Sequence, residues 1–158
     1  MKKCYLLLLV GIFVLTFTSF GLCQEAYVDL RECFVDETGV LYYFWACAGV
    51  DRVNDMEIFL FDPAGNELNF VSISAPPCWY PHASGNYGYW YTEDNPILPG
   101  DCLDEFDFKV PPGHCVVLLR WRFTLDGVPV TDWQDTYFTC WITDVESETW
   151  GSIKSLYR

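Results

Sequence analysis

Positive charge is scarce in this sequence. Nine Lys and Arg residues face 22 Asp and Glu residues in a chain of 158, and the formal net charge is −13. Nucleic acids and anionic lipid surfaces are bound through clustered Lys and Arg, so this balance argues against both as partners. It permits cationic partners and divalent metals, although a well-solvated exported surface explains it more simply.

Histidine is scarcer still, and motifs of catalysis are missing. His82 and His114 are the only histidines, and both stand beside proline or glycine in segments that read as loops. Neither lies in the sequence context of a serine hydrolase base, and zinc-protease spacing and glycine-rich phosphate loops are absent. Pairs of carboxylates are inevitable among 22 acidic residues, so they do not indicate a glycosidase. We therefore expect no enzyme activity and no cofactor, with calcium as the one candidate ion.

Long apolar runs are absent except at the N-terminus. Met1-Lys2-Lys3 precede an uncharged apolar run over residues 4–20, and small residues close it at Ser19 and Gly21. A positive start, an apolar centre and a small-residue exit are the three parts of a secretory signal peptide. The run is shorter than the roughly 20 residues of a membrane span. We expect a secreted, periplasmic or cell-surface protein with no membrane span after cleavage.

The cleavage site sets the domain boundaries. Cleavage after Gly21 or after Cys23 fits the pattern, and the second leaves an even number of cysteines. We expect a signal peptide over 1–23, a β-sandwich domain over 24–145 and a C-terminal tail over 146–158. An uncleaved anchor stays an alternative. A lipoprotein modified at Cys23 is the other, although it would need a small residue where Leu22 stands.

Six cysteines follow the signal. They are Cys33, Cys47, Cys78, Cys102, Cys115 and Cys140. An even count behind an export signal indicates disulfides, whereas zinc is disfavoured because no Cys-x-x-Cys pair is present. Up to three bridges are expected, and the sequence leaves many pairings open. We predict that one of them joins Cys78 to Cys102 and closes the aromatic segment between them.

Short β-branched or aromatic segments alternate with turns about every 8–12 residues. Residues 115–125 alternate most clearly, with arginines on one side and apolar residues on the other, and Asp126-Gly127 follows as a hairpin turn. In residues 26–34 we expect Val28, Leu30 and Phe34 to share one face, and the run 40–48 is apolar enough for a central strand. The fold class is all-β. We expect a single Ig-like antiparallel β-sandwich of about seven to nine strands, stabilised by disulfides.

Three segments carry a resemblance to a known family. They are Ala75-Pro76-Pro77-Cys78-Trp79, Ile97-Leu98-Pro99-Gly100-Asp101, and the run from Glu105 to Gly113. Together they resemble exported Ig-like accessory domains of bacteria and archaea, which are related to fibronectin type III and to the domain associated with α-galactosidases. The resemblance covers residues 40–125 and implies a spacer, presenter or binder without catalytic residues. This chain departs from the family in its six cysteines.

Aromatic residues are abundant, at 18% of the chain. The candidate sugar-binding residues are Trp79, Tyr80, Tyr87, Trp90 and Tyr91. Exposed rigid aromatics can stack on the apolar faces of sugar rings. The competing interpretation is that most of these rings belong to the core or to strand faces, since Tyr89 and Tyr91 alternate with Trp90 as they would in a strand.

Acidic residues crowd into one short span. The candidate calcium ligands are Asp94, Asp101, Asp104 and Glu105. Calcium prefers several hard oxygen ligands on flexible loops, but the spacing matches no established calcium motif and a solvated edge explains it as well. The overall prediction is an exported, non-catalytic structural or interaction module of the cell envelope or extracellular space. Its partner would be a protein or glycan at the cell surface, and a carbohydrate-binding module is the alternative.

Overall fold

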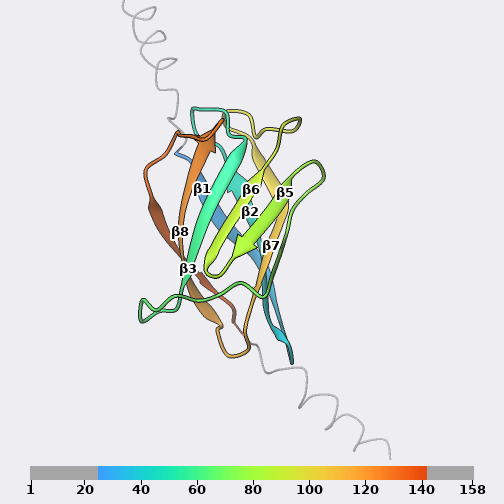
Figure 1. Cartoon of the computed structure of the whole chain (residues 1–158), viewed down its shortest axis with the longest axis vertical. Helices are drawn as coiled ribbons and strands as arrows, with labels where there is room; N and C mark the ends of the chain where they lie inside the picture. The colour runs from blue at the N-terminus through green and yellow to red at the C-terminus, as the bar shows by residue number, and fades with distance from the viewer. Residues whose placement is uncertain (1–24, 142–158) are drawn as a thin grey trace, which may run out of the picture.

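The computed structural model describes residues 25–141, which fold into two antiparallel β-sheets packed face to face (Figure 1). The ten strands are β1 (Tyr27–Asp36), β2 (Gly39–Cys47), β3 (Asp55–Phe61), β4 (Ser72–Ser74), β5 (Tyr80–Ser84), β6 (Tyr87–Tyr91), β7 (Cys102–Val110), β8 (Val116–Leu125), β9 (Val128–Pro129) and β10 (Gln134–Thr139). The expected signal peptide and C-terminal tail lie outside the described residues. No helix within residues 25–141 is long and apolar enough to span a membrane.

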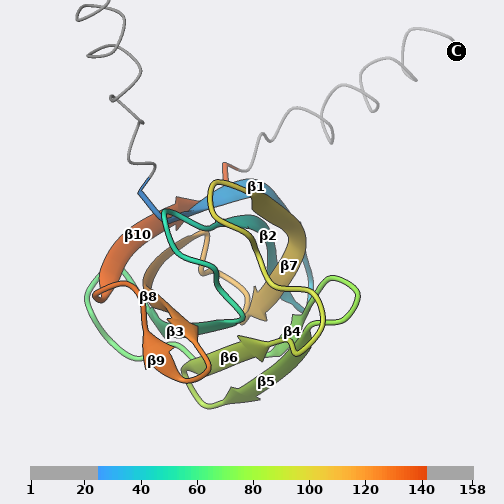
Figure 2. The same ribbon diagram turned by 90° about the horizontal axis from the view of Figure 1, so that it is seen from above.

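The strands divide into a smaller and a larger sheet. The smaller sheet has the order β1-β2-β7-β4, and the larger has the order β10-β8-β3-β6-β5, with β9 paired to β8. Seen from above, β1 lies beside β10 at one lateral edge of the sandwich and β4 lies beside β5 at the other (Figure 2). The predicted all-β sandwich is confirmed. The structure has ten strands where seven to nine were expected, and two of the ten, β4 and β9, are very short.

The alternation predicted for residues 115–125 is confirmed in β8. Its inward side chains are buried between the sheets: Val117, Leu119, Trp121 and Phe123. Arg120 and Arg122 face outward, as expected. Asp126 and Gly127 both have positive φ, at 52° and 76°, as a two-residue type I′ turn requires. Aromatic rings from both sheets pack together in the core. Tyr42 of β2 is stacked on Phe108 of β7 at 5.1 Å between ring centroids, and Phe44 of β2 lies 5.9 Å from Phe138 of β10 in the other sheet.

The expected facing of β1 is wrong at its second half. Val28 is buried and Leu30 is half-buried, but a β-bulge between Leu30 and Glu32 shifts the register of β1 against β2. One extra residue reverses which side chains face inward. Phe34 therefore lies outside, 54% exposed, and Cys33 turns toward the core instead.

Two disulfides are present among residues 25–141. Cys47–Cys102 joins directly opposed residues of β2 and β7, with 4.0 Å between the Cα atoms, and Cys33–Cys140 links β1 to the residue after β10. The predicted Cys78–Cys102 pair is wrong, because the β2–β7 register places Cys47 opposite Cys102 while Cys78 lies in the turn before β5. Cys78 and Cys115 are free within the described part of the chain.

Candidate functional site

The outer face of the larger sheet carries a row of tyrosines on β5 and β6. In β6, Gly88 and Trp90 are buried, so Tyr87, Tyr89 and Tyr91 point outward by the alternation of a strand. Tyr80 of β5 lies directly opposite Tyr91. The ring centroids of Tyr80 and Tyr91 are 5.3 Å apart, and those of Tyr89 and Tyr91 are 5.7 Å apart with nearly parallel planes. We call Tyr80, Tyr89 and Tyr91 the tyrosine row.

A tight turn sets the register of this hairpin. Ser84 ends β5 and Tyr87 begins β6, so Gly85 and Asn86 form a two-residue connection. Gly85 has φ of +62°, and Asn86 is not among the residues with positive φ, which is the pattern of a type II′ turn with glycine first. The turn thereby places Tyr80 and Tyr91 side by side, and His82 beside Tyr89.

A polar network anchors the tyrosines to the middle of the sheet. The hydroxyl of Tyr87 donates a hydrogen bond to Glu57 at 3.0 Å, and Glu57 also forms an ion pair with Arg122. The guanidinium of Arg122 lies over the ring of Trp133, 4.4 Å from its centroid. Burial raises the pKa of Tyr87 above its ordinary value, and its hydrogen bond to Glu57 adds to the rise.

The phenol of Tyr89 is held protonated in the same way. Burial raises its pKa to about 12, and the nearby carboxylate of Asp55 contributes to the rise. The hydroxyls of Tyr87 and Tyr89 therefore remain neutral hydrogen-bonding groups throughout the physiological range. Tyr89 therefore contributes a ring and a neutral hydroxyl to the tyrosine row.

Each of the two arginines on this face is paired with a carboxylate. Arg120 of β8 donates two hydrogen bonds to Asp135 of β10, at 2.8 and 2.9 Å. This contact raises the pKa of Arg120 and lowers that of Asp135, so both groups stay charged. With Glu57 bound to Arg122, the middle of the face has two local charge pairs and no arginine without a carboxylate partner.

Two of the five predicted sugar-binding residues lie in the core. Trp90 is fully buried and donates its indole N–H to the backbone oxygen of Ser74 at 2.8 Å. Trp79 is also buried, and its indole N–H donates to the backbone oxygen of Asn95 at 2.9 Å. Neither ring can stack on a ligand. Tyr80, Tyr87 and Tyr91 do share the outer face, joined by Tyr89, which was missing from the candidates although its alternation with Tyr87 and Tyr91 signalled it.

The predicted calcium ligands are not brought together. Asp104 and Glu105 lie where β7 shifts register against β2, Asp104 is paired with Arg31 at 2.8 Å, and Glu105 has φ of +69°. Asp94 and Asp101 lie in loops outside that strand segment. Residues 25–141 contain no group of three or more His, Cys, Asp or Glu side chains arranged to hold a metal ion.

A cavity of about 380 Å³ opens at the end of the sandwich where β2 ends and β1 begins. Three carboxylates contribute to its lining, those of Glu25, Asp51 and Asp132. Glu25 precedes β1, whereas Asp51 and Asp132 lie in two separate loops. Like the rest of residues 25–141, the three carboxylates form no metal-binding group. The cavity contains no histidine or cysteine that could act as a base or nucleophile.

Comparison with known proteins gives one structural likeness. No family model and no curated protein sequence matches the chain. Among solved structures, the chain is similar to the human F-spondin reeler domain (fragment 2), with a TM-score of 0.44 and 10% sequence identity. The likeness covers 72% of this chain and 92% of that domain.

Proposed function

We propose that this chain is an extracellular, non-catalytic binding module that holds a neutral glycan on the tyrosine row. The observation that carries the proposal is the placement of Tyr80, Tyr89 and Tyr91 as adjacent rings on one open sheet face. Tyr80 is 53% exposed and Tyr91 36% exposed, so both rings have surface to offer a ligand. Aromatic side chains held on strands supply contact area at little cost in conformational entropy.

The charge distribution favours a neutral ligand. Both arginines in the middle of the face are paired with carboxylates, so the face offers no free arginine to a phosphate, sulfate or uronic acid. The formal net charge of −13 disfavours an acidic polysaccharide over longer range. Hydroxyl-rich neutral sugars need hydrogen bonds in place of ion pairs, and the phenol hydroxyls with His82 can supply them.

The disulfides support the extracellular part of the proposal. Such bonds form and persist in oxidising compartments and are rare in the cytosol. A secreted, periplasmic or cell-surface location fits both bridges.

Support for the Ig-like description comes from the strand order, since β1, β2, β7 and β4 face a sheet in which β8 lies between β3 and β10. Neither bridge joins β2 to β8, the place of the bridge in antibody domains.

Binding of the full chain to arrays of neutral and acidic glycans tests the proposal. The wild type should bind a subset of neutral glycans and no acidic ones. The double substitution Tyr80→Ala/Tyr91→Ala should weaken binding by about ten-fold or more, because truncating aromatic residues at a binding centre costs above about 1 kcal/mol each.

Tyr137→Ala is the matched control for this experiment. Tyr137 is an exposed tyrosine of the same sheet, 60% exposed, but it lies on β10 at the opposite edge from β5. Its removal should leave the affinity within about two-fold of wild type, as expected of a surface residue outside the contact. Absence of any glycan binding, equal binding of acidic glycans, or equal loss in the control would each contradict the proposal. Capture of a protein ligand by the tyrosine row would contradict the glycan assignment.

A further inference from the structure

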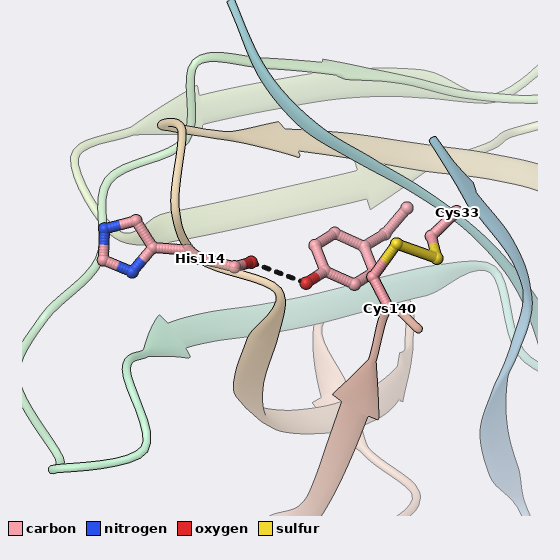
Figure 3. The surroundings of a disulfide bond; sticks show 4 residues. Cys33, His114 and Cys140 are labelled. Carbon is pink, nitrogen blue, oxygen red and sulfur yellow. Dashed lines mark hydrogen bonds between the residues drawn. A yellow bond between two sulfur atoms is a disulfide. The ribbon is translucent and has the colours of Figure 1, made fainter. Parts of the chain in front are cut away.

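Three cysteines lie together at the lateral edge where β1 meets β10. Cys33 belongs to β1, Cys140 follows β10, and Cys115 immediately precedes β8. Figure 3 shows the Cys33–Cys140 disulfide, which spans from the smaller sheet to the larger one. Cys115 is free and partly exposed. A free thiol therefore stands next to an existing disulfide.

The strand register places Cys115 directly opposite Cys140. The β8–β10 ladder pairs Val116 with Thr139, and the next step along both strands pairs Cys115 with Cys140. The backbone confirms this step, because the N–H of Cys140 donates to the oxygen of Cys115 at 2.7 Å. Residues so paired have Cα atoms about 5.5 Å apart and side chains on the same face. This separation lies within the range of about 4.4–6.8 Å that a disulfide spans.

Tyr42 brings the third cysteine into the same cluster. Cys33 is the register partner of Tyr42 on β2, and the bulge in β1 turns Cys33 toward the core. The hydroxyl of Tyr42 donates to the backbone oxygen of His114 at 2.6 Å, one residue before Cys115 (Figure 3). Burial raises the pKa of the Tyr42 hydroxyl, and the charge of a Cys115 thiolate adds to the rise. The imidazole of His114 points away from the disulfide in the same view.

We propose that Cys115 exchanges with the Cys33–Cys140 disulfide and forms a Cys115–Cys140 bridge within the larger sheet. The thiolate sulfur of Cys115 attacks the sulfur of Cys140, a new S–S bond forms, and the old S–S bond breaks with Cys33 as the leaving thiolate. The proton lost by Cys115 is taken up by Cys33. One thiol and one disulfide are present before and after, so the step needs no external oxidant or reductant.

Exchange changes which parts of the fold are covalently joined. The Cys33–Cys140 bond ties β1 of the smaller sheet to the end of β10 in the larger one. A Cys115–Cys140 bond instead joins neighbouring strands that are already hydrogen-bonded. The exchanged form therefore lacks the covalent link between the sheets at this edge and exposes a new thiol at Cys33. The three cysteines therefore form a redox-neutral switch between a sandwich whose sheets are covalently linked at this edge and one that lacks this link.

The test follows thiol identity over time in the oxidised full chain. The protein is incubated at pH 8.5 without added thiol, sampled, quenched in acid, labelled with N-ethylmaleimide and mapped by peptide mass spectrometry. We expect label on Cys33 to rise as label on Cys115 falls, with the total number of labelled thiols unchanged and a Cys115–Cys140 linked peptide appearing. Cys78→Ser should leave this exchange intact, and Cys115→Ser should abolish the labelling of Cys33.

Several results would overturn the proposal. They are label that stays on Cys115 for a day, Cys33 labelling that persists in Cys115→Ser, and a rise in the total number of thiols. A second variant tests the product geometry directly. In Cys33→Ser, the folded protein treated with oxidised glutathione should form the Cys115–Cys140 bridge, and failure to form it refutes the exchange.

Discussion

Gly88 lies on the inward side of β6, between the outward Tyr87 and Tyr89, and we predict that Gly88→Ala destabilises the protein. A Cβ atom at this position would lie 2.8 Å from Cζ of Phe70 and 2.9 Å from Cζ3 of Trp90. Both distances are shorter than carbon atoms tolerate, so at least one ring has to move. Trp90 is fully buried and held by its indole hydrogen bond to Ser74, so it has little room to do so.

The expected magnitude is the difference of two opposing effects. Adding a methyl group to a well-packed core costs about 1–3 kcal/mol. Replacing glycine by alanine where φ is not positive returns about 0.4–1 kcal/mol, because the unfolded chain loses conformational entropy. The free energy of unfolding should therefore fall by about 1–2 kcal/mol. Since β6 carries Tyr89 and Tyr91, the glycan affinity should fall with it.

Denaturant unfolding followed by tryptophan fluorescence measures the change, and a double-mutant cycle locates it. In a Phe70→Leu background, the shorter side chain removes one of the two close contacts. The loss of unfolding free energy caused by Gly88→Ala should then be at most about half of the loss in the wild type. If Gly88→Ala is as stable as the wild type, or if its cost is the same with and without Phe70, the packing argument fails.

Two more predictions concern covalent and ionisable groups. The double substitution Cys47→Ala/Cys102→Ala opens a loop with a sequence separation of 55 and should lower the free energy of unfolding by about 4 kcal/mol in denaturant titrations. The control Cys78→Ala removes an exposed free thiol and should change this free energy by less than about 0.5 kcal/mol. Equal effects of the two changes would contradict the Cys47–Cys102 pairing. Raising the pH from 10 toward 12 should progressively destabilise the protein, because the pKa of Tyr89 is raised from 10.0 to about 12 and that of Tyr42 is raised too, so the unfolded state loses its protons first. The stabilisation that these protonated phenols provide is complete below pH 10 and is lost as the pH rises through their pKa values in the folded protein. A denaturation midpoint that stays constant between pH 10 and 12, with all phenols ionising near pH 10 by ultraviolet absorbance, would refute this prediction.

Local patterns predicted the parts of the fold that depend on neighbouring residues. The alternation of residues 115–125 predicted β8 and its buried face, and Asp126-Gly127 predicted the hairpin after it. Strand alternation and turn chemistry both depend on residues that are close together in the sequence, so they can be interpreted without knowing a distant partner. Tyr89 could have joined the binding candidates by the same alternation, since Tyr87 and Tyr91 flank it two residues away on each side.

Long-range pairing decided what the local patterns left open. The even number of cysteines after the expected signal peptide predicted disulfides, but the partner of Cys102 depended on the β2–β7 register, which sequence spacing does not contain. Likewise, Trp79 and Trp90 are residues of the type that binds sugars, and only the packing of the two sheets decided that both are buried.

The sequence by itself determined an acidic, all-β chain with short strands, tight turns and cysteines suited to an oxidising compartment, because composition and periodicity are properties of neighbours along the chain. The tertiary structure alone decided which aromatics face solvent, which cysteines pair and where the free thiol of Cys115 lies. A single bulge in β1 illustrates the physical reason. One inserted residue exchanges the two faces of a strand, sends Phe34 outward and turns Cys33 toward Cys140, and the pairing with β2 that creates it is a contact between strands.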